Sequence, residues 1–210
     1  MKLLGVLNAL AVSILPALSA GQALAGQGAD ADWPCIQRKV PVLSFGQIWT
    51  GPELPPAASG WEKAPGVSAL VRETAARRKP IADAQTEIMN FAKDLPAGGR
   101  NDGLAMLAQG LFEHMSAERA EVMSGIARYA RNQLETAARL RAESAGLAAL
   151  RAKPDADPNE IAARTERMTI ETRIFEERVQ SLTYVCEIPT LIEQRLYALS
   201  ATVAKAMVNN

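Results

Sequence analysis

Two cysteines, Cys35 and Cys186, are the residues of this sequence best suited to a covalent task. They are its only cysteines, and they do not form the C-x-x-C motif of thiol–disulfide exchange proteins. In an oxidising compartment, an isolated pair most often forms a disulfide. The bridge would close a loop of about 150 residues and stabilise the fold by roughly 5 kcal/mol in the chain-entropy account. We therefore predict a structural disulfide, with two free buried thiols or an intermolecular bridge as alternatives.

The single histidine, His114, limits the metal chemistry that this chain can support. One histidine excludes H-E-x-x-H motifs and multi-histidine sites. Together with Met89, Met106, Met115 and Met123 it suggests a soft-metal site, for example for copper(I). Methionines at helical spacing are more often core residues, however. We therefore predict no metal site and no catalytic residue.

Cofactor motifs are also missing from the sequence. No C-x-x-C-H motif is present for covalent haem, and no glycine-rich loop follows a strand as phosphate binding requires. The densest basic cluster comprises Arg72, Arg77, Arg78 and Lys79, and it is typical of a helix C-terminus. The chain carries 23 basic and 23 acidic residues, so no global field would attract nucleic acid. We predict no cofactor and no nucleic-acid partner.

The N-terminal segment predicts the compartment. Lys2 precedes a largely apolar run from Leu3 to Leu18, and the small residues of Ala23-Leu24-Ala25 follow. These are the three parts of a secretory signal peptide, and the run is too short for a transmembrane anchor. We predict a signal peptide over residues 1–25, cleaved near Ala25, and export to the periplasm. No second long apolar stretch occurs, so no integral membrane span is expected after cleavage.

Residues 26–66 predict an extended arm rather than a long helix. The segment is rich in proline and glycine, which interrupt helices. It also contains all three tryptophans, Trp33, Trp49 and Trp61, whereas disordered tails are usually poor in aromatic residues. The rings would anchor the arm on the helices, with Cys35 fixing its near end. The alternative is an exposed tryptophan face that docks a partner.

Residues 67–210 predict an all-α bundle of four or five helices. One helix is expected from Ser68, as its cap, to Arg78, and a second from Pro80 to about Asp94. A break at 95–99 precedes a long helical pattern to Ala152, capped by Asn101 or Asp102, with Ser116 as a fresh cap or a continuation. A turn at 153–159 then leads into a last long helix over 159–207.

The last long helix has an apolar seam with alternating spacings of four and three. Its members are Ile161, Thr165, Met168, Thr172, Phe175, Val179, Leu182 and Cys186. This is the 3.5-residue repeat of coiled-coil packing. Folding the chain back at 154–158 pairs positions whose numbers sum to about 308 and matches apolar with apolar at most layers. We predict an elongated antiparallel hairpin, although the seam could also close between two chains as a homo-oligomer.

These features predict a non-enzymatic periplasmic interaction or accessory protein with an unidentified protein partner in the cell envelope. Long helical surfaces suit recognition of partner helices or extended chains. The alternative is a periplasmic helical sensor or stress chaperone that binds a metal or a small ligand. That alternative depends on His114 and its neighbouring methionines, and on analogy of fold.

Overall fold

The computed structural model describes residues 33–208. This part of the chain contains helices and irregular segments but no strands. The helices are α1 (Phe45–Ile48), η1 (Pro56–Lys63), α2 (Pro65–Ala75), α3 (Ile81–Asp94), η2 (Ala97–Gly99), α4 (Arg100–Arg151) and α5 (Pro158–Val208). The predicted all-α fold is therefore confirmed. The predicted signal peptide over residues 1–25 lies outside the described residues.

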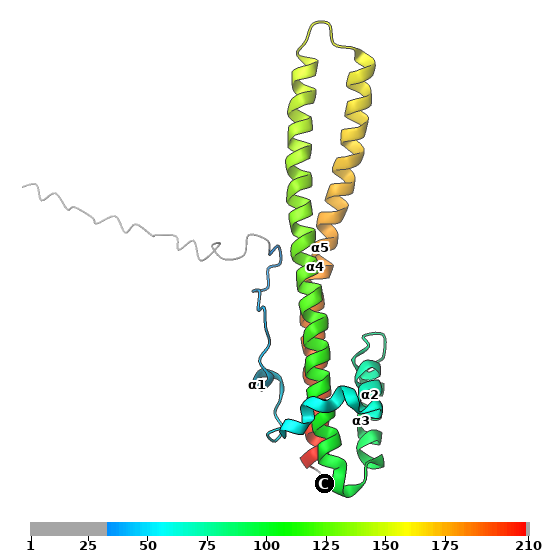
Figure 1. The fold of residues 1–210 in the computed structure, drawn as a ribbon. Coiled ribbons are helices and arrows are strands. Elements are labelled where there is room, and N and C mark those ends of the chain that lie inside the picture. Colours follow the sequence, from blue (N-terminus) through cyan, green and yellow to red (C-terminus); the bar gives the residue numbers. More distant parts are fainter. Residues whose placement is uncertain (1–32, 209–210) are drawn as a thin grey trace, which may run out of the picture.

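Two long helices, α4 and α5, form an antiparallel hairpin that dominates the molecule (Figure 1). At a rise of 1.5 Å per residue, the 52 residues of α4 span about 78 Å. The short turn between the helices ends at Asp157, whose carboxylate accepts a hydrogen bond from the Asn159 amide at 2.8 Å. Asp157 thus caps α5, and Pro158 takes the first helical position, where its missing N–H costs nothing.

The observed contacts match the predicted register of the hairpin. The Tyr129 hydroxyl donates to the Arg178 carbonyl at 3.0 Å. Farther toward the turn, Arg164 pairs with Glu143 at 3.8 Å. In each pair the two numbers sum to about 308, as the apolar seam requires. The seam therefore closes within one chain.

The core occupies only the base of the hairpin, where α2 and α3 pack against the lower parts of α4 and α5 (Figure 1). Its fully buried side chains come from four helices: Val71, Ile88, Leu104, Leu107, Leu111, Met115, Ile192, Leu196, Leu199 and Val203. Pro189 lies within α5 and does not end the helix. A compact helical base thus carries a long projection.

Three predicted capping positions are wrong. Ser68 does not start a helix, because α2 begins at Pro65 and Ser68 is buried inside it. The predicted caps Asn101 and Asp102 also lie inside a helix, since α4 begins at Arg100 after a 3₁₀ turn. Ser116 is a continuation of α4, not a fresh cap.

Candidate functional site

The two cysteines form the predicted disulfide. Cys35 and Cys186 are bonded across 151 positions of sequence, with their Cα atoms 5.5 Å apart. Cys35 belongs to the arm and Cys186 to the middle of α5, so the bridge fixes the start of the described arm halfway along the hairpin. From this point the arm runs down to the base, as Figure 1 shows. The bond serves architecture and leaves no free thiol in residues 33–208.

The tryptophans hold the arm and the start of the bundle in place. Trp61 is only 7% exposed, and its indole N–H donates to Glu113 at 2.7 Å. Trp49 is half-buried against the core, and its indole N–H donates to the Pro52 carbonyl at 2.7 Å. Trp61 therefore offers no ring face to a partner, and both residues act as the anchors that the sequence predicted.

Trp33 is also tied down by its own segment. Its indole N–H donates to the Gln37 carbonyl at 2.7 Å, and the Lys39 ammonium lies 6.0 Å from its ring centroid. Trp33 is half-buried. The contacts of Trp33 are therefore with residues of its own segment. None of the three tryptophans predicted as docking candidates joins another in an exposed aromatic patch.

The predicted absence of a metal site remains a prediction. Among the described residues, no group of three or more histidine, cysteine, aspartate or glutamate side chains is arranged to hold an ion. His114 is half-buried on α4, while the neighbouring Met115 is fully buried in the core and Met123 nearly so. These two methionines thus serve packing.

Buried polar groups connect helices at the base. Arg119 is 4% exposed and donates to Glu193 at 2.5 Å, which links α4 to α5. Arg195 donates from Nε and Nη2 to the Thr74 carbonyl at 3.1 and 2.6 Å, which covers the C-terminus of α2. Burial lowers the pKa of Arg195 from its ordinary value, with nearby Glu118 opposing the shift. These contacts fix the positions of α2, α4 and α5 relative to one another.

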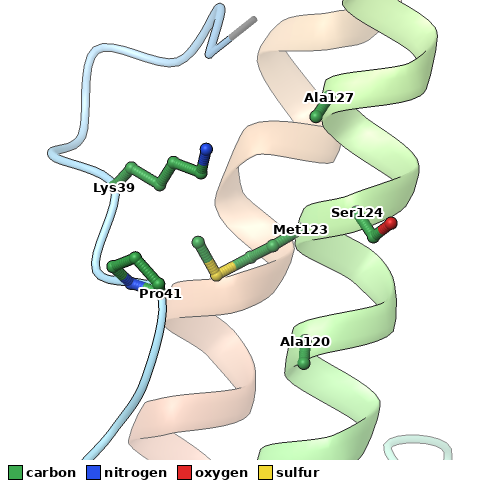
Figure 2. Close-up of a pocket in the computed structure, with 6 residues that line it drawn as sticks. All are labelled: Lys39, Pro41, Ala120, Met123, Ser124 and Ala127. Atoms are coloured by element: carbon green, nitrogen blue, oxygen red, sulfur yellow. The ribbon is translucent and has the colours of Figure 1, made fainter. Parts of the chain in front are cut away.

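A small cavity lies between the arm and α4 (Figure 2). Its volume is about 300 Å³, and it is lined by Lys39, Pro41, Ala120, Met123, Ser124 and Ala127. This is the lower limit for a ligand site. Its walls present the ammonium group of Lys39 and the hydroxyl group of Ser124.

The strongest candidate surface is the projecting part of the hairpin, residues 131–185, which we call the distal hairpin. In this part α4 buries only Gln133 and Leu147, and α5 buries no residue. Several large apolar side chains are instead exposed: Leu134, Ile170, Ile174, Val179, Tyr184 and Val185. A two-helix projection that leaves such side chains in solvent is a surface suited to another helix or chain.

The sequence predicted the hairpin but not this exposed set, and Val179, predicted as a seam residue, is 42% exposed. The signal was available, because Ile170 and Ile174 each lie two residues from the seam residue Thr172. Two residues correspond to about 200° around a helix, so both isoleucines must face away from α4. Apolar residues therefore lie on two opposite faces of α5, and α4 covers one of these faces.

Comparison of the chain with protein-family models, with curated proteins and with solved structures finds no match. In residues 33–208, no helix combines enough length with enough apolarity to cross a bilayer.

Proposed function

We propose that this protein is a non-enzymatic accessory protein of the cell envelope that presents its distal hairpin to a protein partner. The observation that supports the proposal is the contrast between base and projection. The base contains nearly all of the buried side chains, while the distal hairpin exposes Ile170, Ile174 and Tyr184. A projection with little internal core gains little stability from its length, so its length favours a role in reach and recognition.

The disulfide supports a periplasmic location as part of the same proposal. A Cys35–Cys186 bridge persists in oxidising compartments, and the N-terminal sequence predicts export. A rigid arm fixed to α5 would also keep the base and the lower hairpin as one unit while the distal hairpin engages its partner.

A matched deletion tests the proposal. The segments 134–147 and 161–174 are each two heptads long and face each other in the hairpin register, so removing both segments shortens the hairpin without changing the phase of the seam. The full-length protein and this shortened variant should be used as baits in native envelope extract. We expect the full-length bait to retain a specific protein in stoichiometric amount and the shortened bait to lose it.

The result that rejects the proposal is equally definite. If both baits retain the same proteins, the distal hairpin is not the recognition surface. If purified protein contains bound metal, and His114→Ala removes it, the metal-binding alternative replaces the interaction role. Inductively coupled plasma mass spectrometry of both proteins decides that point.

A further inference from the structure

One face of α5 is covered at the base and bare in the distal hairpin. Ile174, Ser181, Ile188, Arg195 and Thr202 recur every seven residues and therefore lie on the same side of the helix. At the base this side meets α2, where Arg195 binds the Thr74 carbonyl, and α3, where Gln85 donates to Thr202 at 3.1 Å. Above the α2–α3 turn no other element of the described chain covers it (Figure 1).

The bare part of this face forms a continuous stripe, which we call the back stripe. Its members are Arg167, Ile170, Ile174, Glu177, Ser181 and Tyr184. The spacings again alternate three and four, so the stripe has the repeat of a second coiled-coil seam. Ile170 is 46% exposed, Ile174 39% and Tyr184 77%. The back stripe is thus the exposed continuation of the face of α5 that α2 and α3 cover at the base.

We propose that the back stripe binds the back stripe of a second copy of this chain, in antiparallel orientation. The charges on the stripe favour this occupant. A two-fold axis level with Thr172 pairs positions whose numbers sum to about 344. Ile170 then faces Ile174 of the second copy, and the reverse contact repeats it.

The flanking layers of the same arrangement pair opposite charges. Arg167 lies one layer beyond Ile170 and faces Glu177 of the second copy, and symmetry repeats this pair on the other side. In a parallel pair with two-fold symmetry, Arg167 would face Arg167 and Glu177 would face Glu177, which is repulsive. The sequence of the stripe is therefore complementary to itself in one orientation only.

The ends of the proposed dimer are complementary as well. Arg77 pairs with Glu118 at 3.1 Å, so the α2–α3 turn is level with residue 190 of α5 in the hairpin register of about 308. In the proposed dimer, the level of residue 190 meets about residue 154 of the second copy. This brings the turn of that copy, with Asp155 and Asp157, to the height of exposed Arg78. The two aspartates of one copy would then lie near Arg78 of the other copy at both ends of the dimer.

Charge exchange tests the proposal with little effect on the fold, since Arg167 and Glu177 are both exposed and the ion pair of Glu177 with Arg173, at 3.7 Å, is exposed too. Sedimentation equilibrium of the disulfide-bonded protein measures the dimer dissociation constant. We expect a dimer in the micromolar range, because a single helix pair is a small interface. Arg167→Glu alone and Glu177→Arg alone should each weaken it about tenfold, because each places two like-charged pairs in the interface.

The double exchange Arg167→Glu with Glu177→Arg should restore the wild-type dissociation constant, because the pairs are merely reversed. Arg141→Glu, an exposed change on α4, is the matched control and should have no effect. Ile174→Glu should give a monomer, with circular dichroism confirming an unchanged helix content. The proposal fails if the wild-type protein is monomeric at 200 μM, as it would be if the stripe binds only another protein, or if the double exchange does not restore the dimer.

This proposal uses the same exposed side chains as the proposed function, Ile170, Ile174 and Tyr184, and the two experiments separate the two occupants. A monomer whose distal hairpin still captures an envelope protein rejects the second copy and keeps the interaction role. If the wild-type protein is a dimer but the shortened and full-length baits capture the same proteins, the second copy is kept and the interaction role is rejected.

Discussion

Gly110 lies where Trp61 and Val71 pack closely against α4. A Cβ atom at this position would lie 2.8 Å from the Trp61 ring and 2.8 Å from the Val71 side chain. Both neighbours are buried, so neither can move away freely. We expect Gly110→Ala to lower the free energy of unfolding by about 1–3 kcal/mol, measured by urea denaturation.

Gly146 provides the matched control for this substitution. It lies in the same helix, it is exposed, and a Cβ there would meet no atom within 4 Å. Gly146→Ala should therefore raise the free energy of unfolding by up to about 1 kcal/mol through helix propensity alone. If Gly110→Ala lowers the free energy of unfolding and Gly146→Ala raises it, the close packing at Gly110 is established. If both substitutions change it in the same direction, the close packing is contradicted.

Lys79 makes a pH-dependent contact at the α2–α3 turn. Its ammonium group donates to Glu73 at 2.7 Å and also to Glu87. Hydrogen bonds to these two carboxylates raise the pKa of Lys79 above its ordinary value of 10.5. Because the folded-state pKa is the higher one, the stabilisation is complete below pH 10.5 and is lost as the pH rises through the raised pKa.

Replacement of Lys79 by methionine tests this contact. Lys79→Met should lower the free energy of unfolding at pH 7, and the difference from wild type should shrink above pH 10.5. Lys93→Met, an exposed change on α3, is the control and should change it by less than about 0.5 kcal/mol at any pH. A Lys79→Met difference that is constant up to pH 11.5 would contradict the assignment.

At the scale of elements, the ion pair between Arg119 and Glu193 joins the two long helices above the core. The side chain of Arg119 is 4% exposed and that of Glu193 is 34% exposed, so we expect the two substitutions to differ in their effect on stability. Glu193→Ala leaves a buried guanidinium without its carboxylate, and we expect a loss of about 3 kcal/mol. Arg119→Met leaves a carboxylate that water can reach, and a flexible apolar chain fills the site, so the loss should be below about 1 kcal/mol.

The double variant completes a cycle and should be nearly as stable as Arg119→Met alone. Urea denaturation of all four proteins gives the coupling. The exposure of Glu193 indicates that water can reach its carboxylate. If Arg119→Met lowers the free energy of unfolding more than Glu193→Ala does, this interpretation is wrong.

The disulfide determines whether the arm remains on the hairpin. Replacement of both Cys35 and Cys186 by alanine removes a cross-link over 151 positions, for which chain entropy gives a cost of roughly 5 kcal/mol. The cost should appear first in the arm, because Arg38 and Ile36 are exposed while the base keeps its own core. We expect limited trypsin digestion to cleave after Arg38 much faster in the double variant than in the oxidised wild type. Equal rates of cleavage would show that other contacts hold the arm.

For the whole molecule, the sequence predicts what depends on repeats and covalent chemistry. The alternating spacing of Met168, Thr172 and Phe175 indicated the seam, and pairing about the turn gave the register that Tyr129 and Arg178 now confirm. The only two cysteines left one intramolecular pairing. These features depend on local spacing or on a unique pair of residues, so a single sequence is enough to predict them.

The remaining features depend on three-dimensional neighbours that a single sequence does not specify. Ser68 resembles a cap, yet Pro65 starts the helix and Ser68 is buried, because α2 packs on α4 through that face. Burial of Trp61 against Gly110 joins residues 49 positions apart, with no periodic signal. The distal hairpin was predicted as helix, but its lack of a covering layer follows only from where α2 and α3 come to rest.

The position of the core predicts how the molecule responds when the projection is shortened. Removal of residues 134–147 and 161–174 deletes 14 residues from each helix, and of the deleted side chains only Leu147 is buried. The base, the disulfide and the turn capped by Asp157 all remain. We expect the shortened protein to fold, with a free energy of unfolding only about 2–4 kcal/mol below wild type.

Its maximum dimension in small-angle X-ray scattering, measured at a concentration at which both proteins are monomeric, should fall by about 21 Å, the rise of 14 helical residues. The number of helical residues should fall only by the 28 that are deleted, because the rest of the hairpin and the base keep their helices. A shortened protein that is molten or unfolded would mean that the projection stabilises the base. Its length could then be explained by stability, and the case for recognition would lose its main support.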